Sequence, residues 1–97
     1  MVIRHVIIRG QVQRVGYRAW AEGAAAGFGL EGWVRNRIDG AVEAVFAGSA
    51  EAVAKMIEAC RQGPRSAQVE TIDEREGTPD DLALRHSGER FSVLGTA

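Results

Sequence analysis

Hydrophobic residues along the chain recur at two spacings, and the spacing changes several times between the two ends. Five stretches combine β-branched or aromatic residues with runs or alternations of apolar positions, which is typical of strands. These stretches cover residues 2–9, 30–36, 41–48, 66–76 and 90–94. Two other stretches, beginning at Tyr17 and Ser49, carry apolar residues three and four positions apart, which is the spacing of one helix face. The pattern therefore predicts a chain that mixes strands with two helices.

Details within the predicted strands indicate how they pair. Residues 6–8 are consecutively apolar, which favours a central strand over an edge strand. Asp39 and Gly40 supply the residue types that tight hairpin turns favour, so the strands on either side of them are expected to form a hairpin. The second hairpin strand points three residues to one face: Val42, Ala44 and Phe46. In the stretch 66–76 the alternation slips between Val69 and Ile72, which predicts a bulge.

The two predicted helices differ in how clearly their ends are marked. The first ends near Gly27 and Gly29, and its apolar stripe comprises Tyr17, Ala21, Ala24 and Phe28, with Trp20 beside it. The second is capped by Ser49, carries Glu51 in its first turn and stops at Gly63 and Pro64. Its buried stripe comprises Val53, Ile57 and Cys60, with Met56 alongside. Residues 77–89 are polar and are expected to form a loop.

The resulting element order is β-α-β-β-α-β with a short strand at the tail. Each helix has one apolar stripe to bury, so both helices should cover one face of an antiparallel sheet. This arrangement is the α+β, ferredoxin-like split βαβ sandwich, with the first and third strands side by side at the sheet centre and the second paired with the third. Residues 1–97 are expected to form a single domain.

Composition limits the partners that the protein could have. The chain has 12 basic and 13 acidic residues, so no global field would attract nucleic acid or an anionic membrane, and any anion site must be local. No apolar stretch approaches the roughly 20 residues that a membrane-spanning helix needs. Cys60 is the one cysteine and cannot form an internal disulfide, and the first residues lack an export signal, so we expect a cytoplasmic protein.

The sequence GQVQRVGYR, residues 10–18, lies between the first predicted strand and the first predicted helix. A turn that leads into a helix N-terminus exposes unpaired N–H groups, and the helix dipole favours an anion there. Gly10 and Gly16 would let successive amides converge, and Arg18 lies in the first helical turn. The stretch does not match the phosphate-binding loop of nucleotide hydrolases, so it favours a small phosphoryl group held without a metal. An ordinary turn with a solvated arginine explains the same residues, and Asn36 alone fits turn chemistry.

Two separated stretches resemble one family. Residues 10–18 resemble the first acylphosphatase signature, G-x-V-Q-G-V-x-[FY]-R, and the segment GWVRNRIDGAVEAVFAG resembles the second. The residues that match the second signature are Gly32, Trp33, Val34, Asn36, Gly40, Val42 and Gly48. The resemblance extends over about residues 6–72, and the predicted element order is that of the acylphosphatase fold.

The resemblance implies an activity and roles for particular residues. Acylphosphatases hydrolyse the carboxyl–phosphate bond of acyl phosphates to a carboxylate and inorganic phosphate. By resemblance, Arg18 binds the phosphate and Asn36 positions the attacking water. The backbone amides that would hold the phosphoryl oxygens belong to Gln13, Arg14, Val15, Gly16 and Tyr17. The implied enzyme uses no metal and no cofactor, its partners are a small acyl phosphate and the phosphate product, and we expect it to be a monomer.

Arg14 departs from the family pattern, which usually has glycine at this position. If the backbone there needs a positive φ, a non-glycine residue costs on the order of 1 kcal/mol. We expect Arg14 to keep the loop usable and to add positive potential at its mouth. Tyr17, which stands where phenylalanine is also found, is expected to lie in the core with its hydroxyl near the surface.

Several other residues are of types that often occur in functional sites, but the sequence does not favour such a role for them. His5 and His86 lack metal-ligand spacing and are expected at the surface, and Cys60 is expected to be a small buried hydrophobe. Asp80 and Asp81 should face solvent, and Trp33 should pack in the core and could partly line the site.

Two alternative functions remain open from the sequence. A ferredoxin-like RNA-binding module would need aromatics on the central strands, and the first strand has none. A catalytically weak module of the same fold that binds anions or a partner is the second alternative, and Arg14 is the residue that favours it.

Overall fold

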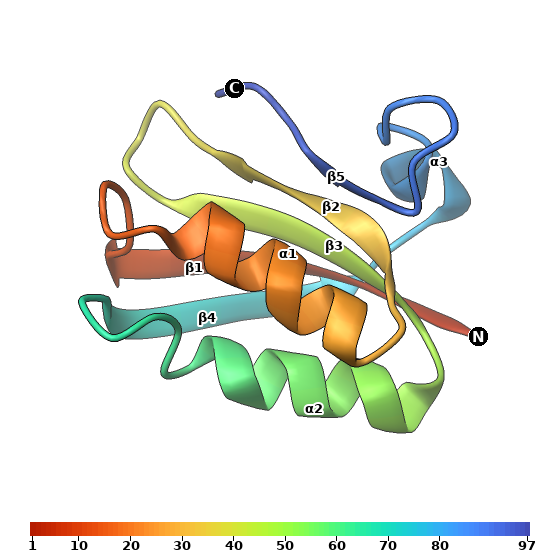
Figure 1. Cartoon of the computed structure of the whole chain (residues 1–97), viewed down its shortest axis with the longest axis horizontal. Coiled ribbons are helices and arrows are strands. Elements are labelled where there is room, and N and C mark those ends of the chain that lie inside the picture. The colour runs from red at the N-terminus through yellow and green to blue at the C-terminus, as the bar shows by residue number, and fades with distance from the viewer.

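Eight elements make up the computed structural model, which describes residues 1–97 (Figure 1). In chain order they are β1 (Val2–Gln11), α1 (Tyr17–Gly27), β2 (Glu31–Asn36), β3 (Val42–Gly48), α2 (Ala50–Cys60), β4 (Gln68–Glu76), α3 (Pro79–Leu82) and β5 (Phe91–Val93). The predicted β-α-β-β-α-β order with a tail strand is confirmed. The short helix α3 lies within the stretch 77–89 that was predicted to be a loop. None of the helices is both long enough and apolar enough to span a membrane.

The sheet has the strand order β4-β1-β3-β2-β5, so β1 and β3 lie at its centre as predicted. The pairs β1–β3, β1–β4 and β2–β3 are antiparallel, but β5 runs parallel to β2. The four strands predicted to form an antiparallel sheet do so, and the tail strand, whose direction was not predicted, makes the sheet mixed. The chain crosses from β4 at one edge to β5 at the other, and a three-residue strand carries no pattern that reveals its direction.

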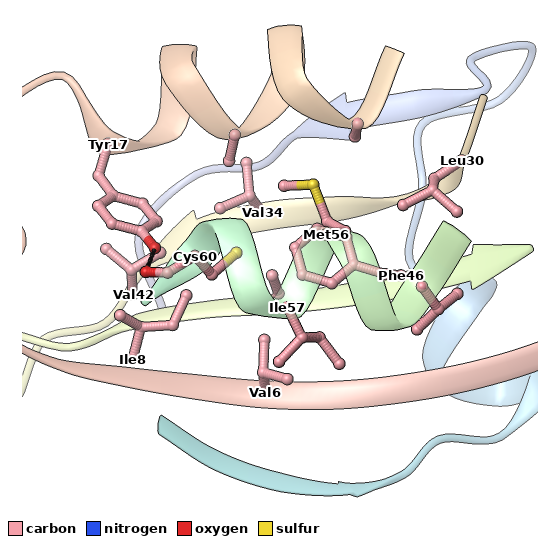
Figure 2. Close-up of a cluster of buried hydrophobic side chains, with 14 of the residues drawn as sticks. Val6, Ile8, Tyr17, Leu30, Val34, Val42, Phe46, Met56, Ile57 and Cys60 are labelled. Atoms are coloured by element: carbon pink, nitrogen blue, oxygen red, sulfur yellow. Dashed lines mark hydrogen bonds between the residues drawn. The ribbon is translucent and has the colours of Figure 1, made fainter. Parts of the chain in front are cut away.

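Helices α1 and α2 cover one face of this sheet, as predicted, and the main core lies between the two layers (Figures 1 and 2). The strands contribute alternate residues, among them Val6, Ile8, Val34, Val42, Ala44 and Phe46. Ser49 caps α2, because its hydroxyl oxygen accepts the Ala52 N–H at 3.1 Å. Phe28 was expected in the core but is 38 % exposed, because α1 ends at Gly27 and the chain turns there.

The predicted bulge in β4 is confirmed, and it lies opposite the end of β1. Arg9 pairs with Thr71 and Gly10 pairs with Val69, so Glu70 has no partner in the register. Gly10 has a φ of 129°, and a Cβ atom there would lie 2.2 Å from the carbonyl oxygen of Gln68. Because only glycine tolerates this backbone and this approach, Gly10 fixes the direction in which the chain leaves β1.

The opposite face of the sheet carries a second, smaller core. It contains Trp33, Val45, Ala47, Leu82 and Leu94. The indole N–H of Trp33 donates to the backbone oxygen of Asp81 at 2.7 Å. Trp33 therefore packs against α3 and does not line the predicted site. Asp80 is exposed as expected, whereas the Asp81 carboxylate accepts the Thr78 N–H and so caps α3.

His5 also lies on this second face, and the expectation of a surface position is wrong. Its side chain is buried because β1 is a central strand with neighbours on both sides. The His5 Nε2 lies 2.6 Å from a carboxylate oxygen of Glu43, whose other oxygen accepts the Arg35 Nε–H at 2.8 Å. Burial alone would raise the pKa of Glu43, but the hydrogen bonds from His5 and Arg35 outweigh it and hold that pKa below its usual value.

Candidate active site

A pocket of about 490 Å³ lies at the N-terminus of α1. Its lining comes from the loop of residues 12–16, from the first turns of α1, and from β2 and β5: Val12, Arg14, Gly16, Tyr17, Arg18, Ala19, Glu22, Asn36 and Val93. Arg18 lies in the first turn of α1 and Asn36 is the last residue of β2, and both line the same pocket. Gln13 and Val15 belong to the same loop without lining the pocket.

The loop of residues 12–16, which we term the cradle loop, has the backbone geometry of an anion-binding nest. Arg14 has a φ of 62° and Gly16 a φ of 80°, whereas Val15 between them has no positive φ. Alternation between left-handed and ordinary backbone turns successive N–H groups toward one concave side. Arg14 is the one non-glycine residue of the chain with a positive φ, so the backbone here does require the conformation that glycine adopts without strain.

The amides of this region lack partners inside the protein. No N–H group of residues 13–16 donates a hydrogen bond, and the first bond of α1 runs from the Trp20 N–H to the Gly16 carbonyl at 3.0 Å. Gly16 provides no side-chain cap, and the first turn of α1 has no acidic residue. The three N–H groups that open the helix are therefore free as well. An anion at this end of α1 would satisfy both the free donors and the helix dipole.

The side chain of Gln13 holds the cradle loop against the β2–β3 hairpin. Its Nε2 donates to the carbonyl oxygens of Arg37 at 2.8 Å and Ala41 at 2.9 Å. The hairpin end is itself closed, because the Arg37 N–H donates to the Ala41 oxygen at 2.8 Å. These contacts join the loop to the end of the strand that carries Asn36. From the sequence Gln13 was expected to act through its backbone only, since nothing local indicates partners 24 and 28 residues away.

Tyr17 fixes the start of α1 to the end of α2. Its side chain is buried, and its hydroxyl donates to the carbonyl oxygen of Cys60 at 2.6 Å (Figure 2). Cys60 is the last residue of α2, so its carbonyl has no partner within the helix, and Pro64, four positions later, has no N–H to donate. The expectation that the hydroxyl lies near the surface is therefore wrong, and burial raises the pKa of Tyr17 so that it stays neutral.

The charged groups of the pocket are unpaired. Arg14, Arg18 and Glu22 take part in none of the ion pairs or side-chain hydrogen bonds of the structure, and neither does the side-chain amide of Asn36. Arg18 and Asn36 are half-buried, whereas Arg14 and Glu22 are exposed. Guanidinium groups with no carboxylate partner remain available to an anionic ligand.

Cys60 and His86 lie outside the pocket, in the kinds of position predicted for them. Burial raises the pKa of the Cys60 thiol to about 12, in agreement with its prediction as a buried hydrophobe. His86 is exposed beside Glu89, as expected of a surface residue. The structure holds no group of three or more His, Cys, Asp or Glu side chains that could bind a metal ion.

Comparison with known proteins connects this pocket to one family. The acylphosphatase family model matches residues 4–92. An acylphosphatase from Rhodopseudomonas palustris (strain BisB18) is 58 % identical over 98 % of this chain and 96 % of its own length. An acylphosphatase from Bradyrhizobium diazoefficiens is 55 % identical over 97 % of this chain and 95 % of its own.

A solved structure agrees with these matches in sequence. The crystal structure of an acylphosphatase from Bacillus subtilis superimposes with a TM-score of 0.83 at 33 % identity, covering 97 % of this chain and 99 % of that protein. Similarity that spans nearly the whole of both chains, in sequence and in fold, shows common descent. The chain therefore belongs to the acylphosphatase family of hydrolases.

Proposed function

We propose that this protein hydrolyses the carboxyl–phosphate bond of acyl phosphates without a metal ion, and that Arg18 and Asn36 are its catalytic residues. The observation that carries the proposal is the set of unpaired amides of the cradle loop and the α1 N-terminus, which adjoins the unpaired side chains of Arg18 and Asn36. The family identity supports the reaction class.

The phosphoryl group binds at the cradle loop in this mechanism. Its oxygens accept hydrogen bonds from the free N–H groups of residues 13–17. The guanidinium of Arg18 donates two parallel hydrogen bonds to the same group, and Arg14 adds positive potential from the exposed side of the pocket. The phosphoryl group is thus held by donors that the fold has already oriented.

Few residues are needed because of the nature of the reaction. Phosphoryl transfer passes through a loose transition state with charge spread over the equatorial oxygens, so catalysis depends mainly on positioning and electrostatic stabilisation. Donors that are oriented before the substrate arrives stabilise that charge without further reorganisation.

Neither the leaving group nor the attacking water needs an acid or a base from the protein. The leaving group is a carboxylate, whose conjugate acid has a pKa of about 4 like that of Asp and Glu side chains, so it departs without a general acid. Asn36 holds the water in line with the bond that breaks, and the water proton passes to a phosphoryl oxygen of the substrate. The products are a carboxylate and inorganic phosphate, and no histidine takes part.

Release of phosphate from acetyl phosphate and benzoyl phosphate, with and without EDTA, tests the proposal. Loss of one preorganised donor costs about two to three powers of ten in rate, which is the loss expected for Asn36→Ala. Arg18→Ala should lower kcat by at least as much and should also raise KM. Arg65→Ala is the matched control, because Arg65 is exposed, unpaired and outside the pocket, and it should retain full activity. Activity that vanishes with EDTA, or that survives both pocket substitutions, contradicts the mechanism.

The alternative function is a weak anion-binding or interaction module, and the left-handed backbone of Arg14 is the observation that favours it. Such a module would bind inorganic phosphate without hydrolysing either acyl phosphate. The phosphate-release assay therefore separates the two functions directly.

A further inference from the structure

Glu22 lines the pocket together with Arg18, and no role has yet been given to it. The two residues are four positions apart on α1 and therefore lie on the same side of the helix. They form no ion pair with each other, and no other cation of the protein pairs with Glu22. A carboxylate without a partner thus contributes a full negative charge to a pocket that receives an anion.

The direction of α1 determines which part of a substrate meets this charge. The phosphoryl group lies at the N-terminus of α1, where the free amides are. Glu22 is four residues beyond Arg18, which is about 6 Å along the axis at the rise of an α-helix. An acyl group that extends from the phosphoryl group along α1 would therefore pass Glu22. Ala19 and Val93, which also line the pocket, offer the acyl chain small apolar contacts.

We propose that Glu22 makes the enzyme selective for acyl phosphates whose acyl group is neutral or cationic, and disfavours those with a second anionic group. The inference rests on the proposed function, since it assumes that the phosphoryl group lies in the cradle loop. A second unit charge on the acyl group that comes within about 6 Å of the Glu22 carboxylate at this solvent-exposed site is repelled enough to lower binding about threefold to tenfold. In the mechanism proposed above, the positive charges of Arg14 and Arg18 are largely offset by the phosphoryl group that they bind.

A pair of substrates of equal length isolates the effect of charge. Butyryl phosphate and succinyl phosphate both have four-carbon acyl groups, which end in a methyl and a carboxylate respectively. We expect kcat/KM for butyryl phosphate to exceed that for succinyl phosphate about threefold to tenfold at low salt. Glu22→Gln should remove most of this preference, and Glu22→Lys should reverse it. Added salt should also reduce the preference, because the charges are exposed and screened, whereas a steric effect would not respond to salt.

Glu51→Gln is the matched control, because Glu51 is exposed on α2 and outside the pocket. It removes the same charge and should leave the ratio of the two kcat/KM values unchanged. If Glu22→Gln changes kcat/KM for both substrates by the same factor, Glu22 acts through Arg18 or the fold, and this inference alone is overturned. An unsubstituted enzyme that does not discriminate between the substrates overturns it as well. If neither substrate is hydrolysed, the proposed function and this inference fall together.

Discussion

Substitution of Gln13 by alanine removes the two hydrogen bonds that hold the cradle loop against the β2–β3 hairpin. Each bond contributes about 0.5–1.5 kcal/mol, and the two carbonyl oxygens that lose the Gln13 amide keep backbone donors within the hairpin. The preference for the docked loop should therefore fall by about 1–3 kcal/mol, which is a factor of about 5–150 in the ratio of docked to undocked forms. We expect kcat to fall by up to this factor, because the phosphoryl group and the water at Asn36 lose their alignment.

Steady-state hydrolysis of acetyl phosphate, with inorganic phosphate as a competitive inhibitor, measures this effect. We expect the inhibition constant for phosphate to change less than kcat, because the amides and Arg18 remain on the same loop and helix. Gln11→Ala is the matched control, since Gln11 is exposed and its side chain forms no hydrogen bond. If Gln13→Ala is folded by circular dichroism and turns over at the rate of the unsubstituted enzyme, the coupling between loop and hairpin is refuted.

Four further predictions follow from individual contacts. Tyr17→Phe leaves the Cys60 carbonyl buried without its donor, so the free energy of unfolding measured in urea should fall by about 1–3 kcal/mol; an unchanged value contradicts the role given to the hydroxyl. Cys60 should resist iodoacetamide at pH 8 until the protein unfolds, because its pKa is raised to about 12. Arg14→Gly removes a charge beside the phosphoryl group and should weaken inhibition by phosphate about threefold, whereas a variant orders of magnitude faster than its parent would mean that arginine impairs the site. The pKa of Glu43 is lower in the folded protein than its ordinary value of 4.5, so the ionised carboxylate stabilises the fold above pH 4.5. This stability is lost as the pH falls through the folded pKa, and Glu43→Gln should therefore flatten the pH dependence of the free energy of unfolding in this acid range.

The architecture was largely predictable because it follows from the periodic burial of apolar residues. The bulge was visible as a break in alternation between Val69 and Ile72, and the cap of α2 as a serine before an apolar stripe. The parallel direction of β5 was not predictable, because only three residues pair with β2 and their direction depends on the path of residues 77–90.

The candidate site was predictable to the extent that its residues are local in sequence. The cradle loop and the helix that follows it are contiguous, so their free amides could be inferred from a strand-to-helix turn with glycines. The side-chain partners of Gln13 and Tyr17 lie 24 to 43 residues away, and no spacing in the sequence reveals such contacts. The burial of His5 was missed for the same reason, since it depends on the position of β1 between β3 and β4.

The binding of inorganic phosphate, followed by the backbone amide resonances of the protein, tests the central claim most directly. The free N–H groups of residues 13–19 should shift together and reach saturation as phosphate is added, because these donors have no other acceptor. The same titration of Arg18→Ala should require a higher phosphate concentration. An anion site at the start of α1 is contradicted if phosphate inhibits the enzyme without shifting the resonances of residues 13–19. It is also contradicted if phosphate shifts the resonances of other residues and leaves these unchanged.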